Sequence, residues 1–150
     1  MPQSLASVLV HLIYSTKNRQ PFITPEIEPE LYAYQAAIFR ELDCSALTIN
    51  GTADHVHALF RLGRTVALCD LVEEVKKRSS KWLKTKRPGL AAFQWQAGYG
   101  AFSLGESGVA TAREYIARQK EHHRRRSFQE EYRAFLRRYR VEYDERYVWD

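Results

Sequence analysis

The chain has 150 residues and a mass of 17.5 kDa, which predicts one domain over residues 1–150 with a single hydrophobic core. Its net charge of +5 favours polyanionic partners. No stretch approaches the roughly 18 apolar residues that a membrane span needs, and Met1-Pro2-Gln3-Ser4 lacks the features of a signal peptide. Membrane and secreted proteins are therefore disfavoured, and we expect a cytoplasmic location.

The two cysteines of the chain are Cys44 and Cys69. They lie in a predicted strand and a predicted helix, without the CxxC spacing that is typical of zinc and redox sites. We expect both to be reduced core residues.

The first predicted elements are a buried strand and a helix. Residues 5–15 form a continuous apolar and β-prone stretch, which indicates a central strand buried on both faces. After a basic loop, apolar residues recur at helical spacing over residues 27–42. This helix is expected to begin at Pro25 or at Pro29, because proline is tolerated in the first turn of a helix.

A hairpin and a second helix follow. Over residues 44–62 the hydrophobic period changes to two, and Asn50-Gly51 begins a turn between two predicted strands. Thr65 can cap a helix whose apolar positions continue to Trp82 and whose other side is rich in lysine.

The last third of the chain contains one strand and two helices. Residues 93–104 are rich in aromatic residues and glycine, which favours a strand with a bulge or a close approach. Ser107 can cap a helix that continues to about Arg124, and a further helix is expected over residues 128–139.

The order strand, helix, strand, strand, helix, strand predicts an α+β fold of the ferredoxin-like, split βαβ type, with C-terminal helices appended. Such a sheet is antiparallel and carries its helices on one face. We expect the other face to be free for a ligand or another chain.

Two histidines in the second hairpin strand form the first candidate site. In His55-Val56-His57 the period of two places both imidazoles on one face of the strand, while Val56 points to the other and can pack inward. Neutral imidazoles on one face are close enough to bind a single divalent transition metal. Such a short motif is also compatible with a pair of structural histidines, one of them bonded to Asp54.

A tyrosine and a glutamine on the third predicted helix form the second candidate site. Tyr115 and Gln119 share one helix face, beside the buried stripe, with His122 close in projection. A tyrosine hydroxyl could attack phosphorus, and a glutamine oxygen could bind a hard cation. Tyr115 alone is better explained as a structural tyrosine, because the chain has nine tyrosines and most of them must be structural. His122 and His123 diverge by about 100° on a helix and are not expected to share an ion.

Together, the pair His55 and His57 and the pair Tyr115 and Gln119 favour metal-assisted chemistry on a phosphodiester. Attack on phosphorus develops negative charge on the non-bridging oxygens and on the leaving 3′ oxygen, which a bound cation neutralises. A tyrosine nucleophile, unlike water, keeps the broken strand as a covalent phosphotyrosine, so transfer is favoured over hydrolysis.

Clusters of basic residues fit a nucleic-acid partner. The lysines of the second helix are equally compatible with a solvated helix face, since some of them have glutamates at pairing distance, whereas Arg124-Arg125-Arg126 is more typical of a contact or tail cluster. Tyr99 could stack on bases, whereas Trp95 and Phe102 are better placed as core residues. The candidate DNA-binding residues are Lys17, Arg19, Lys76, Lys77, Lys81, Lys84, Arg118 and Arg124.

Five segments carry a family resemblance across nearly the whole chain. The sequence resembles the single-tyrosine HUH transposases of the insertion-sequence 200/605 type, whose relatives include the REP-associated tyrosine transposases. HUH denotes histidine, bulky hydrophobe, histidine, which His55-Val56-His57 matches. Ala53 stands where many relatives have proline. The matching segments are residues 11–17, 53–57, 98–103, 115–123 and 143–150.

The resemblance implies a set of roles. Tyr115 would be the nucleophile, and His55, His57 and Gln119 would bind one Mg²⁺ or Mn²⁺. The substrate would be single-stranded DNA with hairpins near the ends of the element, cleaved through a 5′-phosphotyrosine and rejoined by the free 3′ hydroxyl. The family also implies a homodimer that can exchange the tyrosine helix, here through residues 104–108, and a nucleoid-associated location in the cytoplasm.

Three alternatives stay open at the level of the sequence. The first is a domesticated REP-associated enzyme, because mobile and domesticated members share these residues. The second is a non-catalytic single-stranded nucleic-acid-binding module, because the same fold serves RNA-binding domains. A structural metal protein is the third, and it is disfavoured by the lack of cysteine ligands.

Overall fold

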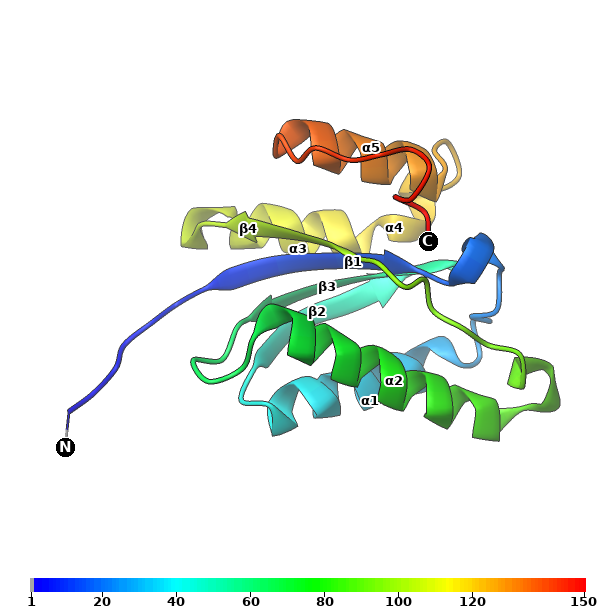
Figure 1. The fold of residues 1–150 in the computed structure, drawn as a ribbon, viewed down its shortest axis with the longest axis horizontal. Coiled ribbons are helices and arrows are strands. Elements are labelled where there is room, and N and C mark those ends of the chain that lie inside the picture. The colour runs from blue at the N-terminus through cyan, green and yellow to red at the C-terminus, as the bar shows by residue number, and fades with distance from the viewer. Residues whose placement is uncertain (1) are drawn as a thin grey trace.

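The computed structural model describes residues 2–150 and contains one antiparallel sheet with the strand order β2-β3-β1-β4 (Figure 1). The strands are β1 (Leu9–Ser15), β2 (Ser45–Gly51), β3 (His55–Arg61) and β4 (Gly100–Leu104). The helices are α1 (Glu28–Glu41), α2 (Leu68–Lys86), α3 (Val109–Ala117), α4 (Gln119–His122) and α5 (Phe128–Arg138). The predicted α+β, ferredoxin-like fold with appended C-terminal helices is confirmed.

Strand β1 lies at the centre of the sheet and is buried along its whole length, as its unbroken apolar sequence predicts. It pairs with β3 on one side and with β4 on the other, antiparallel in both cases. In this register Ile13 lies opposite His57, and Ser15 lies opposite His55. The pairing therefore places the two histidines of β3 beside the best-buried strand of the sheet.

Helices α1 and α2 cover one face of the sheet (Figure 1) and enclose the larger hydrophobic core. Alternate residues of the strands point into this core, because successive side chains of a strand lie on opposite faces. Fully or almost fully buried residues of this core include Leu12, Tyr14, Val56, Ala58 and Phe60 from the strands and Leu31, Ile38, Leu71 and Val75 from the helices.

The opposite face of the sheet is covered by α3, α4 and α5 (Figure 1), so the expectation of a free face was wrong. A second hydrophobic cluster lies there. Because β1 is apolar on both faces, each face needs a cover, and α5 supplies one with its own apolar side. The buried members of this cluster are Ile13, Phe102, Phe128, Tyr132 and Leu136.

The starts of α1 and α5 agree with expectation, whereas the start of α2 differs. Helix α1 has Pro29 in its first turn, which agrees with the later of the two predicted starts. Helix α2 begins at Leu68 behind an extended Ala67, so Thr65 does not cap it. In α5 the Ser127 hydroxyl accepts a hydrogen bond from the Glu130 N–H at 3.2 Å, a true N-terminal cap.

The predicted strand over residues 93–104 is shorter in the structure. Trp95 makes only an isolated bridge with Thr16, and regular pairing begins at Gly100. Trp95 and Phe102 are buried as expected, while Tyr99 is partly exposed.

The predicted helix from Ser107 to Arg124 is broken at Arg118, whose ψ of 20° ends α3 before α4 begins. Ser107 lies in a short 3₁₀ turn, Glu106–Gly108, and does not cap α3 through its side chain.

Of the two cysteines, Cys44 is buried as expected, but Cys69 is exposed. Cys69 precedes Leu71 by two positions on α2, and residues two apart on a helix point about 200° apart. Because Leu71 faces the core, Cys69 faces solvent. None of the helices within residues 2–150 combines the length and hydropathy of a membrane span.

Candidate active site

The two histidines of β3 lie on the sheet face that α3, α4 and α5 cover. Their side chains point away from Val56, which packs into the larger core, as the period of two predicts. Both imidazoles are completely buried. Their orientation is therefore set by hydrogen bonds with neighbouring protein groups.

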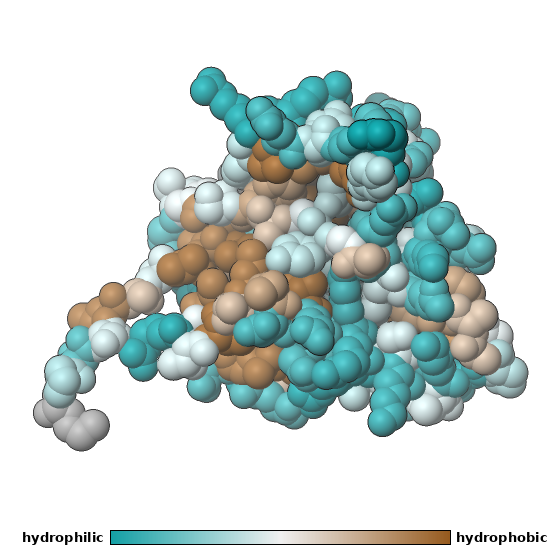
Figure 2. Space-filling model, in the orientation of Figure 1, coloured by the Kyte–Doolittle hydropathy of each residue, from teal (hydrophilic) through white to brown (hydrophobic). Residues whose placement is uncertain are grey.

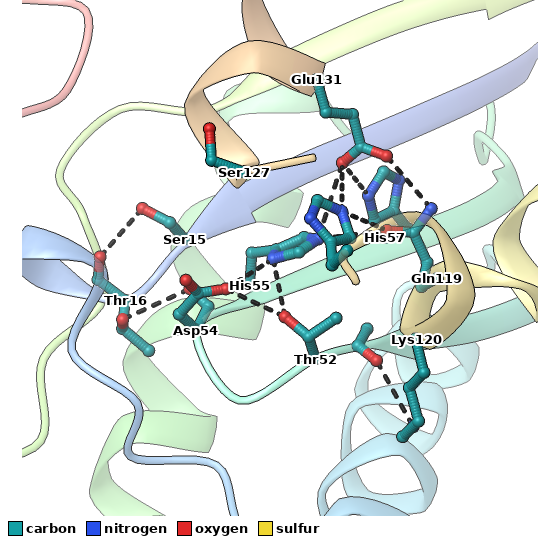
Figure 3. A network of polar contacts seen from close by, with 12 residues as sticks. Ser15, Thr16, Thr52, Asp54, His55, His57, Gln119, Lys120, Ser127 and Glu131 are labelled. Carbon is teal, nitrogen blue, oxygen red and sulfur yellow. Dashed lines mark hydrogen bonds and ion pairs between the residues drawn. The ribbon is translucent and has the colours of Figure 1, made fainter. Parts of the chain in front are cut away.

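The turn between β2 and β3 orients His55. Its Nδ1 lies 2.7 Å from Asp54 Oδ1, which also accepts a hydrogen bond of 2.9 Å from the Thr52 hydroxyl (Figure 3). Burial alone would raise the pKa of Asp54, but its hydrogen bonds with His55 and Thr52 lower it below its ordinary value. A carboxylate at Nδ1 favours a proton there, which leaves the Nε2 lone pair free to act as a ligand.

Gly51 is required at the start of this turn, because a Cβ there would meet the His55 carbonyl oxygen at 2.1 Å. We expect Gly51→Ala to lower the free energy of unfolding by about 1–3 kcal/mol, since backbone atoms must move to relieve the overlap. Gly89→Ala is the matched control, because nothing lies within 4 Å of its added Cβ. Urea denaturation measures both, and equal effects of the two substitutions would contradict this reading.

His57 is bonded at both ring nitrogens. Its Nδ1 lies 2.8 Å from Nε2 of His11, and its Nε2 lies 2.9 Å from Oε1 of Glu131. Burial, with a smaller contribution from His57, lowers the pKa of His11 to about 3, so His11 is neutral at pH 7. A neutral His11 can accept a hydrogen bond from His57 Nδ1 when His57 Nε2 uses its lone pair as a metal ligand, and without a metal His57 Nε2–H can donate to Glu131.

His123 and Glu131 complete a cluster with the two strand histidines. One donor atom from each of His55, His57, His123 and Glu131 lies within 4.8 Å of the other three. Burial alone raises the pKa of Glu131, but His57 and the hydrogen bond from His123 lower it well below its ordinary value. The cluster thus offers three imidazoles and one carboxylate, a set of donors that suits a divalent metal ion.

Gln119 points into the same cluster. Its Oε1 lies 3.1 Å from His55 Nε2 and 3.1 Å from His123 Nε2, and the residue is fully buried. Figure 3 shows His55, His57 and Gln119 oriented toward the carboxylate of Glu131. The expectation that Gln119 stands beside the buried stripe was therefore wrong, because the break at Arg118 lets α4 lean over the histidines.

Tyr115 reaches the cluster from α3. Its hydroxyl donates a hydrogen bond to Oε2 of Glu131, and its ring stacks on His122 with the centroids 4.6 Å apart. Burial, followed by the negative charge of Glu131, raises the pKa of Tyr115. The structure thus brings Tyr115, Gln119 and both strand histidines of one chain together around Glu131.

The helical segment that carries Tyr115 and Gln119 is tied to the sheet and to α1. The side-chain amide of Asn50 donates to the Ile116 carbonyl at 2.8 Å, where the break frees the last carbonyls of α3. Lys120 forms an ion pair of 2.8 Å with Glu28. These contacts hold the segment against the histidines of the same chain.

Sequence reasoning missed Glu131, His11 and the contribution of His123. His122 and His123 do diverge, as expected, but His123 lies four residues after Gln119 and so turns to the same side. This spacing of four residues could have indicated that His123 belongs to the site. Glu131 offered none, because an acidic residue near the start of an amphipathic helix is ordinary.

The predicted DNA-binding residues do not share one surface. Lys17, Lys76 and Lys77 line a groove of about 630 Å³ next to Trp149. Lys76 is turned inward there, since its ammonium donates to the carbonyls of Gln96 and Gly98, and burial lowers its pKa to about 8.

The other predicted basic residues are distributed around the molecule. Arg19 donates to the Trp149 carbonyl at 3.2 Å, and Arg118 pairs with Glu114. Lys81 and Lys84 are exposed on α2, and Arg124 lies in a separate surface hollow near α5.

Comparison with known proteins identifies similar sequences and folds. The family described as "Transposase IS200 like" matches residues 4–119. A candidate transposase from Deinococcus radiodurans R1 is 21% identical with a TM-score of 0.62, over 79% of this chain and 98% of that chain. A REP-associated tyrosine transposase bound to a REP hairpin is 13% identical with a TM-score of 0.61, over 82% of this chain and 72% of that chain. At these identities the two structures show a shared fold. No curated protein matches the chain.

The family match divides the cluster. His55, His57, Tyr115 and Gln119 lie within the matched range, whereas His123 and Glu131 follow it. Of the residues that sequence reasoning missed, His123 and Glu131 therefore lie outside the family match, whereas His11 lies inside it.

Proposed function

The chain belongs to the IS200-like transposase family, and we propose that it cleaves and rejoins single-stranded DNA at hairpin-marked ends through a covalent 5′-phosphotyrosine on Tyr115. The observation that carries this proposal is the position of the Tyr115 hydroxyl, bonded to the carboxylate that also contacts His57 and His123. A structural tyrosine has no need of a buried histidine cluster at its hydroxyl.

The reaction is a transesterification at phosphorus. The Tyr115 oxygen forms the new bond to phosphorus, and the bond from phosphorus to the 3′ oxygen breaks, which releases a strand that ends in a 3′ hydroxyl. The hydroxyl proton of Tyr115 passes to Glu131 Oε2, which already accepts its hydrogen bond. The leaving 3′ oxygen takes this proton from Glu131, and a 3′ hydroxyl reverses these steps when it attacks the phosphotyrosine.

A divalent cation fits the donor set, and we propose Mn²⁺ or Mg²⁺ held by His55, His57 and Gln119, with His123 and Glu131 within reach. When bound, the cation neutralises charge on the phosphate oxygens. The imidazole-rich set suits Mn²⁺ better than Mg²⁺, which prefers oxygen ligands. Asp54 and His11 would orient the strand histidines from behind, as partners of metal-bound histidines commonly do.

The arrangement favours action in cis, because Tyr115 lies against the histidines of its own chain. In a homodimer, exchange of the tyrosine helix would require α3 and α4 to leave Asn50 and Glu28. We propose that cleavage uses the cis arrangement and that any exchange belongs to strand transfer.

The test is the formation of a covalent adduct. The protein is incubated with Mn²⁺ and a library of single-stranded DNA that carries hairpins, and a denaturing gel is searched for a shifted band. We expect the band with the wild-type protein and with Tyr143→Phe, a substitution of an exposed tyrosine, and no band with Tyr115→Phe. Absence of any adduct across the library, or an unchanged band in Tyr115→Phe, would reject the proposal.

A domesticated, REP-associated role is the second candidate. It is favoured by the fold shared with the REP-associated tyrosine transposase bound to a REP hairpin. Cleavage would be the same chemistry in both cases, so the two roles differ in the DNA that is cut. Inverted repeats directly flanking the gene would indicate a mobile element, whereas dispersed hairpins elsewhere in the genome would indicate a domesticated enzyme.

A further inference from the structure

A cleft of about 430 Å³ lies between α3 and α5. Tyr115, Glu131 and His11 form part of its lining, so it opens onto the candidate nucleophile and onto two groups that contact the histidine cluster. Its size falls within the roughly 300–1,000 Å³ of small-molecule sites. Figure 2 shows hydrophobic atoms exposed beneath α5, on the side that faces the sheet.

The lining of the cleft contains a row of aromatic rings. The centroid of Phe135 lies 5.7 Å from that of Tyr115 and 6.4 Å from that of Tyr139, whose plane is within 11° of that of Phe135. Leu104 and Ala112 add apolar surface. Flat apolar walls with exposed aromatic faces are the surfaces on which single-stranded bases stack.

Two arginines provide positive charge in the same cleft. Arg126 and Arg138 both line it and are exposed. Neither forms an ion pair within residues 2–150, where the paired arginines are Arg61, Arg78, Arg118, Arg133 and Arg146. Both arginines are therefore available to phosphate, for which the planar guanidinium is well suited.

Access to Tyr115 favours this cleft over the larger groove beside Trp149. His55, His57 and Gln119 are completely buried, so a phosphate must approach through an opening that includes the Tyr115 side chain. The groove beside Trp149 includes none of the cluster residues and neither Tyr115 nor His11. The cleft between α3 and α5 includes Tyr115 together with both apolar and cationic surface.

We propose that this cleft binds the nucleotide next to the scissile phosphate, with its base against Phe135 and Tyr139 and its phosphates at Arg126 and Arg138. The inference rests on the proposed function, because a nucleotide bound in the cleft would present its phosphate to Tyr115 for attack. It adds a binding site on α5, a helix that lies beyond the family match. Because stacking tolerates every base, the site would select single strands over duplexes more than it selects a sequence.

The first experiment measures binding without cleavage. A fluorescent 20-nucleotide single strand of random sequence is titrated by anisotropy into protein that carries Tyr115→Phe, without metal. We expect Arg138→Ala in this background to weaken binding about tenfold and to reduce the slope of log affinity against log salt by about 1. Arg137→Ala is the matched control, an exposed neighbour outside the cleft that removes the same charge, and it should stay within about twofold.

The second experiment locates the base. Strands that contain 5-iododeoxyuridine are cross-linked by light to the Tyr115→Phe protein, and the modified peptide is identified by mass spectrometry. We expect cross-links at Phe135 or Tyr139, and we expect Tyr139→Leu to remove a large part of them. Cross-links confined to Tyr99 and Trp149, with equal effects of Arg138→Ala and Arg137→Ala, would overturn the inference.

The outcomes separate this inference from the proposed function. An adduct on Tyr115 without the Arg138 effect would leave the function standing and reject the cleft. The Arg138 effect without an adduct would reject the proposed cleavage and leave the cleft standing as a site for single strands. If Arg138→Ala instead disrupts a dimer in the absence of DNA, the cleft is occupied by a second copy of the chain, and the nucleotide site is rejected.

Discussion

Replacing His57 by alanine is expected to abolish adduct formation and to remove the stabilisation that Mn²⁺ gives to the wild-type protein. His57 is completely buried, and its Nε2 contacts Glu131 at the centre of the donor cluster. Mn²⁺ at about one hundred times its dissociation constant should raise the free energy of unfolding by about 2.7 kcal/mol. For a chain of this length that corresponds to an increase in Tm of about 5–10 °C.

The measurement is thermal unfolding with Mn²⁺ and with a chelator. His122→Ala is the control for metal binding, since His122 stacks on Tyr115 and lies outside the donor group. The control should retain the Mn²⁺-dependent increase in Tm, and His57→Ala should lose it. An equal increase in His57→Ala would show that the metal binds elsewhere.

Replacing Glu131 by glutamine is expected to slow adduct formation by about two to three orders of magnitude. The substitution keeps the shape of the side chain but removes the only carboxylate of the donor group, to which Tyr115, His57 and His123 are all bonded. A neutral amide can neither take the Tyr115 proton nor contribute negative charge to a metal site. We also expect the free energy of unfolding to fall by about 1–3 kcal/mol, because buried imidazoles lose a strong hydrogen-bond partner.

Glu130→Gln is the matched control for this prediction. Glu130 precedes Glu131 on α5 and is exposed, so the control removes one negative charge from the same helix without entering the cluster. Single-turnover rates of adduct formation and urea denaturation measure the two effects. If Glu131→Gln and Glu130→Gln behave alike, Glu131 has no role in the reaction.

Local patterns in the sequence predicted the sheet and most of its helices. The unbroken apolar residues of β1 and the alternation in β3 report burial directly, because the side-chain period of a strand is two. The same alternation placed His55 and His57 on one face and Val56 on the other. Details such as the start of α2 or the break at Arg118 depend on tertiary contacts, among them the Asn50 bond to the end of α3.

Only part of the candidate site could be predicted from the sequence. Tyr115 and Gln119 were identified because a spacing of four residues places them on one side of the chain, and the structure does bring them to the histidines. Their roles and those of the ligands remain predictions. The distribution of the basic residues could not be predicted, because no local pattern shows that Lys76 bonds to carbonyls of the chain itself.

The sequence by itself thus determined the strand that carries His55 and His57, the helix that carries Tyr115, and the resemblance that connects them. Only the tertiary structure decided that α3, α4 and α5 close over the histidine face, which places Glu131 at the centre of the cluster and opens a cleft beside Tyr115. The physical reason is that strand and helix periodicity report which face of an element is buried. They do not report which distant element covers that face, because packing between elements far apart in the chain decides it.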